Sequence, residues 1–121
     1  MRAMVVDDSS VMRRIHQKSL EGLGWSVALA EDGEDALAKL GGQDPCELLL
    51  TDLHMPKMDG MGLIEAVRKD PRYAAMKIIM VTSDGVMEVV QEAMAKGAND
   101  LLIKPFTAED FANRLKELFR A

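Results

Sequence analysis

Short apolar runs, each about as long as a β-strand, recur along the chain. They cover residues 3–6, 25–30, 47–51, 77–82 and 100–103. Continuous apolar runs of this length are typical of strands that are buried on both faces of a sheet. Between the runs, apolar residues recur at helical spacing in stretches near 10–22, 33–40, 60–69, 86–96 and 107–119.

Five strands alternating with five helices predict an α/β fold, with a parallel sheet covered by helices on both faces. Thr107-Ala108-Glu109-Asp110 begins the last helical stretch as an acidic variant of the capping box. The chain contains no repeat, linker or low-complexity tract. We therefore expect one domain over residues 1–121.

Composition narrows the classes of function. The chain is 48% hydrophobic and 29% charged, and its net charge is −5. Arg13-Arg14 is its only basic cluster, so the sequence argues against direct nucleic-acid binding. No apolar run reaches the length of a membrane span, so we expect no membrane insertion. The single cysteine, Cys46, heads an apolar run and suits a buried thiol in a reducing cytoplasm.

Side chains able to do chemistry follow four of the five predicted strands. Asp7 and Asp8 follow the first strand and Asp52 ends the third. Thr82 ends the fourth strand, and Lys104 follows the fifth. In open α/β sheets ligands bind at the carboxyl ends of the strands, so these residues are expected at one edge.

The charges at this edge call for a cation. Three carboxylates and one ammonium sum to −2, and a divalent cation would neutralise that charge. Hard oxygen ligands favour Mg²⁺ over Zn²⁺, and Mg²⁺ leaves positions open for phosphate oxygens. Lys104 and Thr82 suit further phosphate oxygens, and Asp52 could be a nucleophile that forms an aspartyl-phosphate.

Each of these residues also has an ordinary interpretation. Asp8 or Ser9 could simply cap a helix, and Thr82 could belong to a turn. Together, at four strand ends of one sheet edge, they favour a functional site.

The motifs at these positions resemble the receiver domains of two-component response regulators, most closely the single-domain chemotaxis (CheY-like) type. The resemblance covers the whole chain. It is carried by the following motifs: "VVDDSSVMRRI" (5–15), "LLLTDLHMPKMDG" (48–60), "MVTS" (80–83) and "KPFT" (104–107). It implies a flavodoxin-like sheet of strand order 2-1-3-4-5.

The resemblance also implies roles for single residues. Asp52 is the expected phosphoacceptor, which takes a phosphoryl group from the phosphohistidine of a sensor kinase or phosphotransfer domain. Asp7 and Asp8, with Asp52 and the backbone carbonyl of His54, are the expected Mg²⁺ ligands. Thr82 is the expected switch hydroxyl.

Lys104 is expected to pair with the phosphoryl group, and a cis bond to Pro105 is implied. Such a domain catalyses its own phosphorylation and dephosphorylation and is not a turnover enzyme. An output partner is expected on the face formed by residues 86–119.

One position departs from the family pattern. Receivers often carry Tyr or Phe three residues before the lysine, and Leu101 stands there in this chain. Leucine offers less contact area than tyrosine and no phenolic hydroxyl. The usual coupling between the threonine and an aromatic side chain is therefore put in question.

Other functions stay open at this point. A degenerate receiver would bind partners without phosphorylation, and a phosphatase would use an aspartyl-phosphate intermediate. A flavodoxin-like FMN carrier shares the sheet order, although Asp7-Asp8 would repel its phosphate. We also expect His16 to be exposed on its helix, and Met4, Met80 and Met94 to lie in the core.

Overall fold

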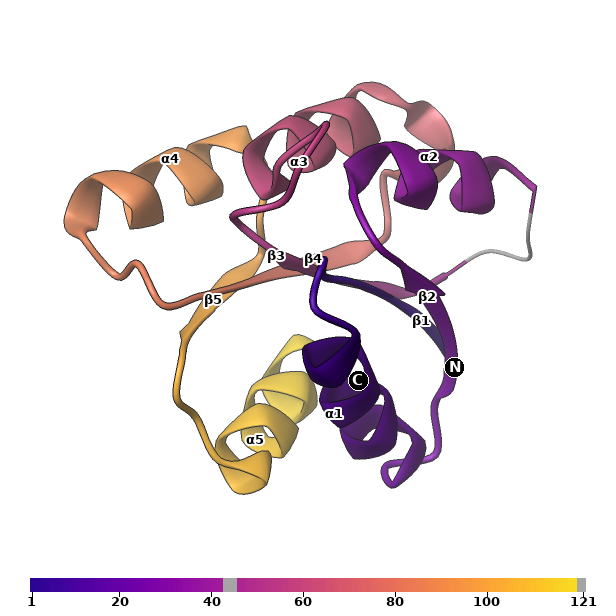
Figure 1. Ribbon diagram of the computed structural model, residues 1–121, viewed down its shortest axis with the longest axis vertical. Helices are drawn as coiled ribbons and strands as arrows, with labels where there is room; N and C mark the ends of the chain where they lie inside the picture. Colours follow the sequence, from indigo (N-terminus) through magenta and orange to yellow (C-terminus); the bar gives the residue numbers. More distant parts are fainter. Residues whose placement is uncertain (43–45, 120–121) are drawn as a thin grey trace.

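The computed structural model describes residues 1–42 and 46–119 (Figure 1). Its strands are β1 (Arg2–Val6), β2 (Ser26–Ala30), β3 (Leu48–Asp52), β4 (Lys77–Thr82) and β5 (Asp100–Ile103). Its α-helices are α1 (Ser10–Glu21), α2 (Gly33–Gly41), α3 (Gly60–Lys69), α4 (Met87–Lys96) and α5 (Ala108–Leu118). A short 3₁₀ helix, η1 (Pro71–Tyr73), precedes β4.

The five strands form one parallel sheet of order β2-β1-β3-β4-β5. Helices α2, α3 and α4 cover one face, and α1 and α5 cover the other (Figure 1). The predicted flavodoxin-like α/β fold is therefore confirmed. Among the described helices, none is long and apolar enough to cross a membrane.

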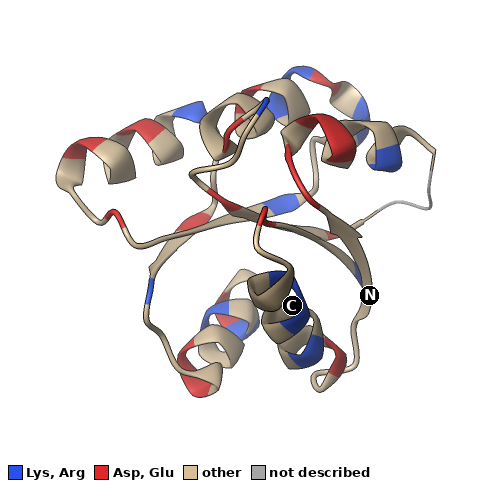
Figure 2. Cartoon of the chain, in the orientation of Figure 1, with Lys and Arg blue, Asp and Glu red and all other residues tan. Residues whose placement is uncertain are grey.

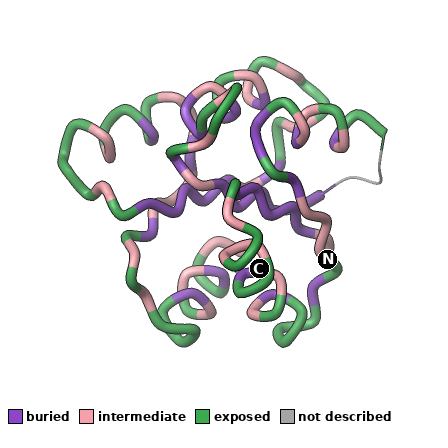
Figure 3. The backbone as a smooth tube through the Cα atoms, in the orientation of Figure 1, coloured by how far each residue is buried: buried purple, intermediate pink, exposed green. Residues whose placement is uncertain are grey.

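The core lies on both faces of the sheet because the side chains of each strand alternate between them. Along β1, Met4 and Val6 pack under α2 and α3, whereas Ala3 and Val5 pack under α1 and α5. The other two central strands alternate in the same way. The three central strands, β1, β3 and β4, are the most deeply buried part of the fold (Figure 3). Cys46 is buried, as expected.

Local sequence signals fix where helices begin. The Ser9 hydroxyl accepts a hydrogen bond from the Met12 N–H and caps α1. Thr107 and Asp110 form the predicted capping box of α5, in which each side chain accepts from the other residue's N–H. Such caps satisfy backbone donors that lack a partner within the helix. The Lys104–Pro105 peptide bond is cis, as implied.

Two expectations about burial are wrong. His16 is buried, with only 4% of its surface exposed, because α1 turns His16 and Leu20 toward the sheet. Ile15, one position earlier, is 49% exposed. Met94 is 45% exposed, because Ala93 is the α4 residue that packs inward.

Candidate functional site

Strand register brings the predicted site residues to one edge. Val6 of β1 pairs with Thr51 of β3, so the residues that follow them, Asp7 and Asp52, leave neighbouring strands at the same level. Asp52 in turn pairs with Val81, one residue before Thr82. Residues far apart in the sequence therefore meet at the carboxyl edge, as predicted.

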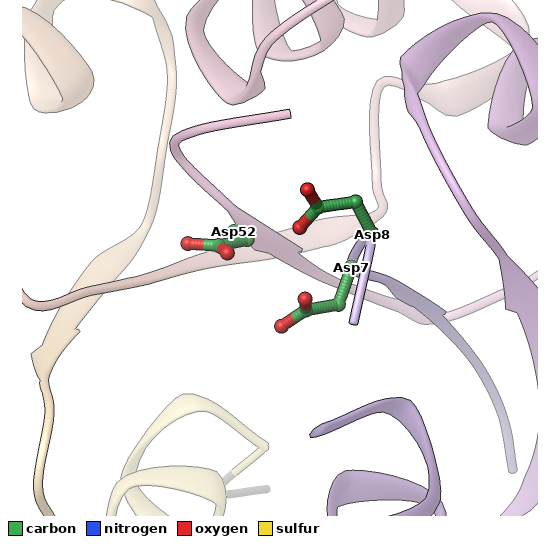
Figure 4. Close-up of side chains that lie close together, drawn as sticks. All are labelled: Asp7, Asp8 and Asp52. Atoms are coloured by element: carbon green, nitrogen blue, oxygen red, sulfur yellow. The ribbon is translucent and has the colours of Figure 1, made fainter. Parts of the chain in front are cut away.

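Three carboxylates gather at this edge (Figure 4). One oxygen each from Asp7, Asp8 and Asp52 lies within 4.8 Å of the others. Asp7 is only 2% exposed, Asp52 is half-buried, and Asp8 is exposed. Partial burial of like charges so close together is unfavourable unless a cation compensates them.

The chain fixes the position of Asp7 from three sides. Its backbone N–H donates to the Ala30 carbonyl, and its side chain accepts from the Ser9 N–H at 2.9 Å. The Arg13 guanidinium, one helical turn into α1, donates to the Asp7 backbone carbonyl. The sequence showed Arg13 only as part of a basic pair, and nothing in its spacing from Asp7 indicated this contact.

Lys104 supplies the positive charge that the protein itself brings to the cluster. Its Nζ lies 3.8 Å from an Asp7 carboxylate oxygen and 3.7 Å from an Asp52 oxygen. The Lys104 side chain as a whole is 24% exposed. Its backbone N–H donates to the Thr82 carbonyl, which ties the lysine to the end of β4.

The environment of Asp52 disfavours its charged form. Burial raises the pKa of the Asp52 carboxyl above its usual range, and the nearby charges of Asp7 and Asp8 raise it further. Lys104 and a hydrogen bond from the Leu53 N–H oppose that rise. At Asp52, Lys104 therefore offsets burial and the neighbouring carboxylates only in part.

The sequence allowed either Asp8 or Ser9 to be a simple helix cap, and the structure distinguishes the two residues. Ser9, not Asp8, caps α1. Asp8 instead lies with its carboxylate beside those of Asp7 and Asp52 (Figure 4). The paired aspartates are therefore part of the carboxylate cluster.

Thr82 is fully buried at the end of β4. Its hydroxyl accepts a hydrogen bond of 3.0 Å from the Asp84 N–H, a turn interaction of the kind the sequence allowed. The hydroxyl is thus already engaged in this structure. This bond uses the hydroxyl as an acceptor, so its own O–H can still donate to a ligand oxygen.

The loop after Asp52 is closed at its base. The Gly60 N–H donates to the Leu53 carbonyl at 2.8 Å, and a side chain at Gly60 would collide with the Asp52 carbonyl. Only glycine lets α3 begin this close to β3. His54 is exposed within the loop, and its carbonyl as a metal ligand stays a prediction.

The donor set fits Mg²⁺. All three side chains offer carboxylate oxygens, the hard ligands that Mg²⁺ prefers. They come from the ends of β1 and β3, and their oxygens lie close enough together to share one ion. The cluster carries three negative charges against one ammonium. A divalent cation would complete that balance.

Comparisons of the sequence and of the structure with known proteins give matches of the same kind. The sequence model of the family described as "Response regulator receiver domain" matches residues 3–116. "Chemotaxis protein CheY1" of Helicobacter pylori is 40% identical over 117 residues, which are 96% of this chain and 94% of that protein. "Chemotaxis protein CheY homolog" of Campylobacter jejuni is 40% identical over 119 residues, covering 98% and 92%. Among solved structures, chemotaxis protein CheY4 of Vibrio cholerae aligns with a TM-score of 0.91 at 33% identity, over 98% of both chains.

Proposed function

Because the chain belongs to the response regulator receiver family, we propose that it is a phosphorylation-switched signalling module in which Asp52 accepts the phosphoryl group. The observation that carries the proposal is the meeting of three carboxylates with the Lys104 ammonium at one strand edge. Transfer is self-catalysed, and the protein is not a turnover enzyme.

In the proposed reaction an Asp52 carboxylate oxygen attacks the phosphorus of a phosphohistidine. A P–O bond forms while the P–N bond breaks, and the electron pair of that bond stays on the imidazole nitrogen. The attacking carboxylate must be ionised. Lys104 favours that state, and it can pair with a phosphoryl oxygen once the charge of Asp52 has been transferred into the acyl phosphate.

Asp7, Asp8 and Asp52, with the His54 carbonyl, would hold Mg²⁺ at this edge. When bound, the ion supplies positive charge for the oxygens of the transferring phosphoryl group. Asp7 is suited to anchor it, because hydrogen bonds from Ser9 and Arg13 fix both its side chain and its backbone. Asp8 is exposed and can reach the ion directly or through water.

The partners that we propose are a sensor histidine kinase or phosphotransfer domain as donor and an output protein as receiver of the signal. The relatives named above are chemotaxis proteins, which supports chemotaxis as the process. The output surface is proposed on the 86–119 face. Four exposed apolar residues support it: Val86, Met87, Met94 and Ile103.

The decisive experiment treats the protein with acetyl phosphate and Mg²⁺ and measures its intact mass. We expect one phosphoryl adduct in the wild type and none in Asp52→Asn. Asp70→Asn is the matched control, because it makes the same change at an exposed pair with Arg72 and should keep the adduct. Absence of an adduct in a wild type that binds Mg²⁺ would favour a degenerate receiver.

A further inference from the structure

We propose that Gly33, the first residue of α2, is a positioning residue for the metal site, although it lies outside the carboxylate cluster. It acts through the metal loop, defined as residues 53–59 between β3 and α3. The inference rests on the proposed function, because the metal loop carries the His54 carbonyl expected to bind Mg²⁺. It predicts that Mg²⁺ binding and the start of α2 are coupled.

The metal loop is held at two places. At its base the Leu53 carbonyl accepts from the Gly60 N–H. At its far end the Met58 carbonyl accepts from the Gly33 N–H at 3.2 Å. The tip of the loop lies beside the start of α2 (Figure 2), so this second hold comes from a separate element of the fold. His54 lies between the two holds.

The second hold leaves no room for a side chain on α2. A Cβ built on Gly33 would lie 2.7 Å from the Met58 Cγ, 2.8 Å from its Cβ and 2.9 Å from its carbonyl oxygen. Contacts to a fixed backbone oxygen cannot be relieved by a rotamer change alone. Any residue larger than glycine must therefore push the metal loop away from α2.

The loop backbone at this point is also under constraint. Lys57 has a φ of 65°, a conformation that a lysine rarely adopts. The neighbouring Met58 N–H donates to the Pro56 carbonyl at 2.7 Å, which closes a tight turn. Lys57 Nζ also lies 3.9 Å from the buried Asp32 carboxylate, just before Gly33. A turn this tight transmits a displacement of Met58 toward His54 instead of absorbing it.

The test is the affinity of the metal site in the substitution Gly33→Ala, measured by isothermal titration of Mg²⁺ into the unphosphorylated protein. We expect binding to weaken by roughly 10-fold or more, the usual effect of losing a group that orients a metal ligand. Gly41→Ala, at the other end of the same helix, is the matched control. A Cβ there meets nothing within 4 Å, so its affinity should stay at the wild-type value.

A second measurement uses the wild type alone. Coupling is reciprocal, so Mg²⁺ should slow amide hydrogen exchange at the Gly33 N–H, which donates to the metal loop. Residues at the end of α2 near Gly41 should slow only as far as the stabilisation of the whole domain by Mg²⁺ requires. A role for Gly33 in helix stability alone would slow its amide no more than the amides near Gly41. This measurement stands even where Gly33→Ala fails to fold.

The outcomes separate this inference from the function on which it rests. Wild-type affinity in Gly33→Ala, or exchange at Gly33 that Mg²⁺ slows no more than exchange near Gly41, would overturn the inference while leaving phosphorylation of Asp52 intact. A wild type that binds Mg²⁺ weakly and accepts no phosphoryl group would instead overturn the proposed function. Weakened binding in Gly33→Ala, together with Mg²⁺-dependent protection of its amide, supports the inference.

Discussion

At the scale of single residues, Asp52 shows why a functional site costs stability. Its carboxyl is half-buried beside Asp7 and Asp8, and both burial and those charges raise its pKa. A raised pKa means that the ionised form is less favourable in the folded chain than in the unfolded chain. At neutral pH the nucleophile is therefore held in its ionised form at the expense of folding.

Replacing Asp52 with Asn should consequently stabilise the metal-free protein. We expect a gain in unfolding free energy of about 0.5–2 kcal/mol, the range typical of a single stabilising substitution. Urea denaturation in EDTA at pH 7 measures it. Asp70→Asn, which breaks an exposed pair with Arg72, should give no gain. A metal-free Asp52→Asn less stable than wild type would contradict this account of the site.

At the scale of elements, α1 meets the segment after β5 through His16. The His16 ring stacks on Phe106 with a centroid distance of 5.9 Å, and its Nε2 is buried without a hydrogen-bond partner among the described residues. Burial lowers the pKa of His16 below its ordinary value of 6.5; Asp7 partly opposes this, and Lys104 adds to it. The contact thus favours a neutral imidazole.

The stability of this contact should depend on pH. Below pH 6.5, and down through the lowered folded pKa, the unfolded chain binds a proton at His16 that the folded chain does not. Unfolding free energy should therefore fall as pH drops through that window. His16→Gln should reduce the fall between pH 7 and pH 5.5, measured by urea denaturation. His54→Gln, at an exposed position, should keep the wild-type dependence; equal slopes in all three proteins would contradict the prediction.

Strand β5 contains the residue at which this chain departs from its family. Leu101 is partly buried and packs with the cluster under α3 and α4. It also lines a hollow of about 460 Å³ beside α5. A side chain between the core and this surface can couple the two only if it has two packing positions.

Leu101→Tyr should leave phosphorylation of Asp52 by acetyl phosphate intact, because the residue lies outside the carboxylate cluster. It should change how residues 86–119 respond to phosphorylation, since tyrosine is larger and carries a hydroxyl. Amide hydrogen exchange over that face, with and without acetyl phosphate, measures the response. Leu102→Val, a buried apolar change next to it, is the control. An identical response in Leu101→Tyr and wild type would remove Leu101 from the mechanism.

The elements were predictable because each carries a local signal. Apolar runs located the strands to within about a residue, and the Thr107–Asp110 box marked the start of α5. The side of α1 that faces the sheet was not predictable. Ile15 and His16 are adjacent, and hydrophobicity favours burial of Ile15, whereas His16 is the buried residue. The hydrogen bond from Gly33 to Met58 joins residues 25 positions apart and has no periodic signal at all.

At the scale of the whole molecule, the carboxylate cluster came from topology. Once the strands were known, it could be inferred that the residues after them meet at one edge, because parallel strands all end on the same side of the sheet. The 4.8 Å spacing of the carboxylates could not be inferred, since it depends on hydrogen bonds from the Ser9 and Leu53 N–H groups to side chains and from Arg13 to the Asp7 backbone. Those contacts hold the three carboxylates together only in the folded state, so the excess negative charge at this edge exists only there.

A ligand that binds only the folded state must stabilise the whole domain, and this gives the last prediction. Unfolding separates Asp52 from Asp7 and Asp8, so the unfolded chain offers Mg²⁺ no comparable site. The gain in unfolding free energy should be about 2.7 kcal/mol when free Mg²⁺ is 100 times its Kd. Thermal unfolding at increasing MgCl₂, with NaCl added to hold ionic strength constant, measures it. Asp8→Asn keeps the Ser9 cap of α1 but removes an exposed carboxylate of the cluster, so the Mg²⁺-dependent rise in Tm should shrink while α1 stays folded. A Tm that rises equally in wild type and Asp8→Asn would place the Mg²⁺ effect elsewhere on this chain of net charge −5.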